Sequence, residues 1–201
     1  MSSGKGILFI VSGPSGVGKG TVLKQVCEDM RDISVNVSVT TRKPREGEID
    51  GVHYRFITTD AFERFVESDG MYEYVRVLDY GYGTPKTYVD EKLSKGEDVI
   101  LEIETIGAQK IREKHACVSI FIVPPSLEEL QRRLESRGTE TKEQIQKRMN
   151  KCREELKCID RYDYVVLNDE IGRCVQKVDA IIEAERQKVF RNKENIEKIV
   201  K

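Results

Sequence analysis

The sequence has almost no excess of charge of either sign. Its 201 residues include 34 Lys and Arg against 35 Asp and Glu, which gives a formal net charge of −1. Proteins that hold nucleic acid or an anionic membrane through their overall charge have a clear basic excess, so the totals indicate neither partner. Any binding function must therefore reside in local groups of residues.

Cysteines are few and lack the spacing of a disulfide framework or a zinc site. They are Cys27, Cys117, Cys152, Cys158 and Cys174, an odd number without a C-x-x-C pair. This pattern favours reduced thiols in a cytoplasmic protein. The N-terminal residues lead into a short apolar run and not a long one, so we expect neither a signal peptide nor a membrane span. Repeats and low-complexity segments are also absent, and the length suits one compact body.

The most informative segment is Gly13 to Thr21, Gly-Pro-Ser-Gly-Val-Gly-Lys-Gly-Thr. It follows the apolar run Ile7 to Val11 and precedes a helical stripe that begins at Val22. A glycine-rich loop between a strand and a helix directs backbone N–H groups and the helix dipole at one point, where Lys19 adds a positive charge. We therefore predict a phosphate-binding loop. It departs from the usual pattern in one respect, because Gly20 follows Lys19 and the hydroxyl comes one residue later, on Thr21.

Apolar runs and helical patterns alternate along the chain, which predicts an open α/β sheet. A weaker strand is expected at Val35 to Val39. Capping boxes predict helices that open at Ser126 and at Thr141. A long amphipathic helix is expected from Val175 to Val189, followed by a frayed charged tail from Arg191 to Lys201. The runs that read as buried parallel strands are Ile7 to Val11, Val99 to Ile103, Val118 to Val123 and Tyr164 to Leu167.

Residues 38–96 interrupt this alternation. Thr, Arg, Pro and Gly are concentrated at positions 40–51, and short strand patterns follow around a helix at Ala61 to Glu67. We interpret this region as an inserted subdomain. Residues 137–148 form a second candidate insertion, with the polar loop Arg137 to Thr141 between two helices.

A phosphate loop alone is compatible with an ATPase, a switch protein or a kinase, so the acceptor must be found elsewhere. Arg42 and Arg45 lie three residues apart around Pro44, which could place two guanidinium groups on one phosphate. Tyr54 could add a phenolic donor. From these residues alone, a solvated basic turn and an ordinary half-buried strand tyrosine remain alternatives.

Two carboxylates, Glu102 and Glu104, end an otherwise apolar strand and point to the same side of it. Open α/β sheets bind ligands at the carboxyl ends of their strands, so this pair could serve a metal, a substrate or a charged side chain. A structural ion pair with a neighbouring lysine is the competing interpretation.

Taken together, these segments resemble the guanylate kinases of the bacterial type, in order and over nearly the whole length. The resemblance implies a P-loop NTPase-type α/β fold: a three-layer core with a parallel sheet (1–37, 97–125 and 159–190), an inserted mixed-sheet GMP-binding subdomain (38–96) and a helical lid (about 126–158). One family position differs, because Ile106 precedes Gly107 where the family has glutamine. The segments that carry the resemblance are Gly13 to Gly16, Ser38 to Glu48, Gly81 to Pro85 and Arg137 to Thr141.

The resemblance implies ATP-dependent phosphorylation of GMP to GDP, with dGMP as a further substrate, in purine nucleotide metabolism. It places the GMP phosphate on Ser38, Arg42, Arg45, Tyr54 and Tyr82. Guanine would be read by Glu73, because a carboxylate can accept the N1 and N2 protons together, with Gly83, the hydroxyl of Thr84 and the carboxylate of Glu104 nearby. Independently of the resemblance, Thr84 before Pro85 reads as a helix N-cap.

On the donor side, the resemblance implies that cations gather around the transferring phosphoryl group. The catalytic candidates are Lys19, Arg137 and Arg148; without the resemblance, the arginines would be read as solvated helix residues. The expected cofactor is Mg²⁺, held mainly by the ATP phosphates and water, with Thr21 or Glu102 acting directly or through one of those waters. The residues expected to bind ATP are Gly13, Pro14, Ser15, Gly16, Val17, Gly18, Lys19, Gly20, Thr21, Arg133 and Asn168.

Two other functions stay open at this point. A kinase for another nucleoside monophosphate is disfavoured by Glu73. A non-catalytic, peptide-binding guanylate-kinase-like domain is disfavoured because Lys19, Arg137 and Arg148 are all present. The expected partners are ATP and GMP, without nucleic acid or membrane, and the expected state is a monomer or homodimer. His53 and His115 are interpreted as structural.

Overall fold

The computed structural model describes residues 5–77, 79–136 and 141–200, which form two β-sheets. The larger sheet has five parallel strands in the order β2-β7-β1-β8-β9. Its strands are β1 (Leu8–Ser12), β2 (Ile33–Val35), β7 (Asp98–Glu102), β8 (Val118–Val123) and β9 (Tyr164–Leu167). The expected parallel α/β sheet is therefore confirmed, and its four main strands match the apolar runs to within one residue at each end.

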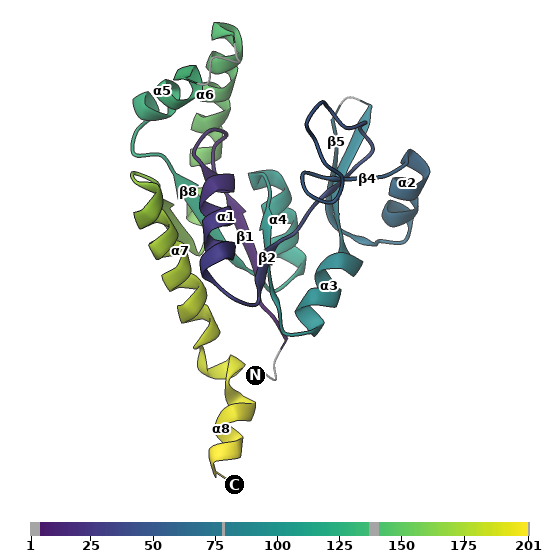
Figure 1. The fold of residues 1–201 in the computed structure, drawn as a ribbon, viewed down its shortest axis with the longest axis vertical. Helices are drawn as coiled ribbons and strands as arrows, with labels where there is room; N and C mark the ends of the chain where they lie inside the picture. Colours follow the sequence, from purple (N-terminus) through teal and green to yellow (C-terminus); the bar gives the residue numbers. More distant parts are fainter. Residues whose placement is uncertain (1–4, 78, 137–140, 201) are drawn as a thin grey trace.

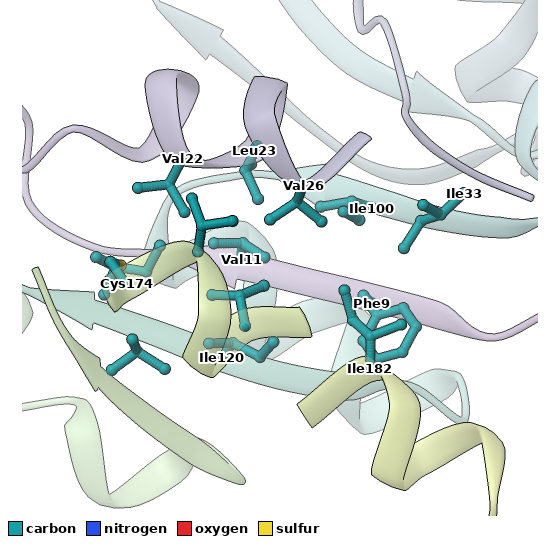
Figure 2. Close-up of a cluster of buried hydrophobic side chains, with 14 of the residues drawn as sticks. Phe9, Val11, Val22, Leu23, Val26, Ile33, Ile100, Ile120, Cys174 and Ile182 are labelled. Carbon is teal, nitrogen blue, oxygen red and sulfur yellow. The ribbon is translucent and has the colours of Figure 1, made fainter. Parts of the chain in front are cut away.

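Helices cover both faces of this sheet (Figure 1). On one face, α1 (Lys19–Asp29) and α7 (Ile171–Arg186) pack against Phe9 and Val11, which are fully buried. Figure 2 shows these two residues between the side chains of the two helices. On the other face, Leu8 and Ile10 pack with residues of α3 (Lys86–Ser94) and α4 (Thr105–Lys114). The strict alternation along β1 produces three layers, as predicted.

The second sheet is separate from the first and has the strand order β4-β3-β6-β5. It is mixed, because β3 pairs in parallel with β4 and antiparallel with β6. Its outer helix α2 (Thr59–Glu67) buries Phe62 against this sheet, beside the main body in Figure 1. Its strands are β3 (Val39–Thr40), β4 (Arg55–Phe56), β5 (Met71–Val77) and β6 (Tyr80–Pro85).

Helices α5 (Leu127–Ser136) and α6 (Lys142–Leu156) pack together at one end of the molecule (Figure 1). Thr141 and Gln144 form the complete capping box expected at the start of α6. At the start of α5, the Glu129 N–H donates to the Ser126 hydroxyl at 3.1 Å, but the Glu129 carboxylate accepts from Arg132 and Arg133. The second capping box is therefore only half formed, because a charged partner attracts the carboxylate more strongly than a backbone N–H does.

Three local predictions are wrong. The segment Val35 to Val39 is not one strand, since β2 ends at Val35 and β3 begins at Val39 in the other sheet. Thr84 is not a helix N-cap, because it lies in β6 and α3 is capped at Pro85. The tail contains the helix α8 (Lys193–Val200), which extends beyond the core.

The short 3₁₀ helices η1 (Ile159–Arg161) and η2 (Val189–Arg191) precede β9 and α8, respectively. Among the described residues, no helix is both long enough and apolar enough to cross a membrane.

Candidate active site

The loop between β1 and α1 has the backbone geometry of a phosphate-binding loop. Gly13, Gly16 and Gly18 have φ values of 149°, 90° and 97°, a backbone region that residues other than glycine rarely adopt. A Cβ at Gly13 would lie 2.2 Å from the carbonyl oxygen of Ile122 in β8. The loop therefore packs closely on the carboxyl edge of the sheet, and α1 begins at Lys19 with its N-terminus facing the loop.

The Lys19 side chain folds back over this loop. Its ammonium donates to the carbonyl oxygens of Gly13 at 2.7 Å and Pro14 at 3.3 Å. Burial lowers the pKa of Lys19 below its ordinary value of 10.5, while the carboxylates of Glu102, Glu155 and Glu104 act in the opposite direction. Phosphate oxygens would replace carbonyl oxygens as stronger acceptors for this cation.

Asn168, after β9, anchors the loop from its other side. Its side-chain NH₂ donates to the carbonyl oxygen of Val17 at 2.7 Å, and its backbone carbonyl oxygen accepts from Arg133 at 3.2 Å. Asn168 is buried, with 1% exposure. Asn168 is thus bonded to the loop backbone and Arg133 to Asn168, and the expectation that they bind ATP remains a prediction.

Arg148 of α6 donates a hydrogen bond to the Ser15 hydroxyl in the loop. Helix α6 therefore brings one of the predicted catalytic arginines to the phosphate loop, across 133 residues of sequence. Arg137, the other arginine, lies outside the described residues.

Two adjoining cavities open at the carboxyl edge of the parallel sheet. The first, of about 630 Å³, is lined by loop residues including Lys19 and by Lys151 and Glu155 of α6. The second, of about 530 Å³, lies against the mixed sheet and includes Glu73 and Tyr82. The residues that line both cavities are Ser38, Tyr54, Glu102, Ile103 and Glu104. The structure therefore joins the phosphate loop to the predicted GMP residues through one cleft.

Glu73 faces Thr84 across the antiparallel pair β5 and β6. The Thr84 hydroxyl donates to Glu73 Oε1 at 3.1 Å, and burial raises the pKa of Glu73 above its ordinary value of 4.5. A Cβ at Gly107 of α4 would lie 3.1 Å from Glu73 Oε2. The absence of a side chain there leaves room for the second carboxylate oxygen, so Glu73 presents an acceptor in a narrow slot.

Arg42 is already paired with an acidic residue of its own turn. Its guanidinium donates to both oxygens of Glu48, at 2.9 and 2.8 Å, and this pair raises the pKa of Arg42 and lowers that of Glu48 to about 2. Arg42 Nε is buried and has no hydrogen-bond partner among the described residues. Tyr54 and Tyr82 lie beside the Arg42 guanidinium, and their two rings contact each other edge to face with centroids 5.8 Å apart. Arg45 lies on the exposed turn, where its backbone N–H donates to Glu48 at 2.7 Å.

Glu102 and Glu104 both line the cleft, as expected from their spacing. Glu104 forms an ion pair with Lys151 at 2.7 Å, so the structural interpretation considered for this pair holds for one member. Glu102, the last residue of β7, lies beside the first turn of α1, with its Oε2 4.0 Å from the position of a Cβ on Gly20. Thr21 is exposed in the first turn of α1.

Sequence reasoning missed three charged residues of this cleft region: Glu48, Lys151 and Glu155. Glu48 was part of the basic turn, but its pairing with Arg42 depends on how the turn folds. Lys151 and Glu155 follow Arg148 by three and seven residues, which places all three on one face of α6. That spacing was the sequence feature from which Lys151 and Glu155 could have been predicted to lie near Arg148.

The donor set suits a magnesium ion held mainly by nucleotide phosphates and water. Among the residues that the structure describes, no group of three or more His, Cys, Asp and Glu side chains could hold a metal. Magnesium is commonly bound through one or two carboxylates, substrate phosphates and water. The carboxylate of Glu102 beside Gly20 fits that requirement, and Thr21 offers a hydroxyl in the same turn.

Comparisons with known proteins agree on one family. Residues 5–185 match the family model described as guanylate kinase. The chain is 48% identical to the guanylate kinase of Caldanaerobacter subterraneus subsp. tengcongensis over 94% of this chain and 93% of that protein, and 48% identical to that of Latilactobacillus sakei over 98% of each. The crystal structure of guanylate kinase from Anaplasma phagocytophilum is similar with a TM-score of 0.75 at 32% identity, covering 95% of this chain and 92% of that one.

Proposed function

Because this chain belongs to the guanylate kinase family, whose enzymes transfer a phosphoryl group from ATP to GMP, we propose that the cleft described above is its active site. ATP would bind with its phosphates on the loop from Gly13 to Thr21. GMP would bind against the mixed sheet, with its phosphate directed at the same loop. The observation that carries this proposal is the continuity of the cleft from Lys19 to Glu73.

Recognition of guanine would depend on Glu73 and its partner Thr84. Guanine presents donors at N1 and N2, and a carboxylate accepts both, whereas adenine presents an acceptor at N1. The Thr84 hydroxyl fixes one carboxylate oxygen through its 3.1 Å bond. Since Thr84 is fully buried, this orientation is set before the base arrives.

The GMP phosphate would be held by Arg42 and Arg45, with hydroxyl donors from Ser38, Tyr54 and Tyr82. Arg42 Nε supports this role, because a buried guanidinium N–H without a partner is costly until an acceptor reaches it. The bidentate pair with Glu48 holds the rest of the guanidinium in place. Phosphate binding then needs little reorganisation of this side chain.

In this active site the protein would contribute positioning and positive charge. The GMP phosphate oxygen attacks the γ-phosphorus of ATP, and the bond to the β-γ bridging oxygen breaks as the new bond forms. Lys19 and Arg148 would stabilise the negative charge on the transferring group, together with Arg137. Magnesium, when bound, would neutralise the phosphate oxygens, with Glu102 and Thr21 nearby.

We include dGMP as a second substrate, because the residues assigned to GMP address its base and phosphate and leave the 2′-hydroxyl out. We also propose a cytoplasmic role in purine nucleotide metabolism, as a monomer or homodimer. The near-neutral net charge supports a function without nucleic acid or membrane.

A coupled assay of ADP formation at saturating ATP, with GMP or dGMP as acceptor, tests this substrate range. We expect both to be phosphorylated, and both rates to vanish when EDTA removes the divalent metal. Turnover of GMP but not of dGMP would show that dGMP is not a substrate. A rate that persists in EDTA would show that the reaction does not need a divalent metal.

A further inference from the structure

One face of helix α6 is directed at the cleft. Arg148, Lys151 and Glu155 follow each other at spacings of three and four residues, so they lie on the same side of the helix. Arg148 bonds Ser15 in the phosphate loop, and Lys151 and Glu155 line the 630 Å³ cavity beside Lys19. A neighbouring side of α6 packs on α5 through apolar residues such as Ile145 and Met149.

The ion pair of Lys151 leads out of α6, unlike two other charged contacts near the C-terminal end of this helix. Lys157 and Arg153 bond residues of α6 itself, Glu154 and Asn150. Lys151 instead reaches Glu104, which lies 47 residues earlier as the N-cap of α4, at 2.7 Å. This contact connects α6 to the part of the cleft that the two cavities share, because Glu104 lines both.

The surrounding charges explain why Lys151 is needed at this place. Glu102, Glu104 and Glu155 all face the same cavity, and Lys19 and Lys151 are the cations that line it with them. Glu155 is buried, with 8% exposure. The Glu104 side chain is 71% exposed, so the 2.7 Å bond from Lys151 is what holds its carboxylate toward the cleft against repulsion by the two neighbouring carboxylates.

We propose that Lys151 is a positioning residue for GMP, which holds the Glu104 carboxylate on the cleft wall so that it faces the bound nucleotide. The inference rests on the proposed function, and on the place beside guanine that the family resemblance implies for Glu104. Lys151 itself acts through Glu104 and does not touch the reacting atoms. Its loss should therefore weaken binding of GMP and leave the chemical step nearly unchanged.

The test is a double-mutant cycle on the KM for GMP, with Lys151→Met, Glu104→Gln and the double variant, each measured at saturating ATP. An exposed pair of this kind is worth little, so we expect Lys151→Met to raise the KM for GMP about threefold, with kcat and the KM for ATP close to wild type. Lys151→Arg should restore the KM. Added salt should reduce the difference, since the pair is partly exposed.

The matched control is Lys157→Met, which removes the same charge and an ion pair from the same helix at its C-terminal end. It should leave the KM for GMP unchanged. In the Glu104→Gln background, Lys151→Met should have no further effect.

The outcomes separate the inference from the proposed function. If Glu104→Gln raises the KM for GMP but Lys151→Met does not, or if the two effects multiply independently, Lys151 is only a surface residue and the inference is overturned. If Glu104→Gln leaves the KM for GMP unchanged in an active enzyme, the role assigned to Glu104 is wrong, and the inference is overturned with it.

Discussion

Replacing Glu73 by glutamine should weaken the enzyme's preference for GMP and raise its free energy of unfolding at neutral pH. The variant keeps the shape of the side chain but replaces one acceptor oxygen with an NH₂ donor. In the structure, one carboxylate oxygen accepts from Thr84 at 3.1 Å and the other lies in the slot beside Gly107. Guanine N1–H and N2–H would then face a donor where they now face an acceptor.

The size of the binding effect follows from the bonds that are lost. A hydrogen bond to a charged acceptor contributes about 1.5–3 kcal/mol, and an unpaired buried donor costs about 1–3 kcal/mol. We expect Glu73→Gln to weaken GMP by about 1 to 3 kcal/mol, roughly a 5- to 150-fold rise in the KM for GMP. Discrimination against AMP should fall by a similar factor.

Stability should move the other way at neutral pH. Burial raises the pKa of Glu73, so the folded protein binds this proton more tightly than the unfolded chain does. The contribution of Glu73 to stability is then complete below about pH 4.5, its ordinary pKa, and decreases as pH rises through the raised value. Glutamine does not titrate. The free energy of unfolding of the variant should therefore increase relative to that of the wild type as pH rises, and this relative increase should be absent at low pH.

Two measurements check this prediction: the KM values for GMP and AMP in a coupled assay, and urea unfolding between acid and neutral pH. Glu63→Gln is a suitable control, because Glu63 is a half-exposed carboxylate of α2 that pairs with Arg76. The reasoning is refuted if Glu73→Gln has the wild-type ratio of GMP to AMP activity. Another residue would then read the base.

Three further predictions address the donor side and the motion of the lid. Lys19→Met should lower kcat by at least about a hundredfold with an unchanged circular dichroism spectrum, because a preorganised charge at the transferring phosphoryl group is removed; near-normal turnover would reject this role. Glu102→Ala should raise the magnesium concentration needed for half-maximal rate, whereas a titration that overlays the wild-type curve would leave this carboxylate a structural role. Small-angle scattering should show a smaller radius of gyration with GMP and a non-hydrolysable ATP analogue together than with neither; equal radii would mean that the site is preformed.

The phosphate loop and the core could be predicted because their signals are local. The run at Ile7 to Val11, the glycines after it and Lys19 are contiguous, and each requirement acts on neighbouring residues. The three layers followed from the alternation of buried strands and amphipathic helices. The weaker strand at Val35 to Val39 could not be placed, because its ends pair in different sheets and pairing is decided by distant residues.

In the cleft, too, contacts between distant residues could not be predicted from local sequence patterns. The roles predicted for Glu73 and Thr84 came from the resemblance. The residues alone indicated Arg42 as a phosphate ligand, with a solvated turn as the alternative, and Thr84 as a helix cap. The ion pair between Lys151 and Glu104 joins α6 to the N-terminus of α4, so no short-range pattern could reveal it. Its helical spacing from Arg148 shows only which face it shares.

The central claim is that one cleft joins an ATP phosphate loop to a guanine-reading pocket. A coupled assay of ADP formation, with ATP and each of GMP, AMP, CMP and UMP as acceptor, tests it most directly. We predict rapid turnover with GMP and a kcat/KM for the other three that is lower by at least about a hundredfold, because the buried acceptor of Glu73 would be left unpaired or opposed. Comparable turnover of AMP, or no turnover of any of the four, would contradict the account.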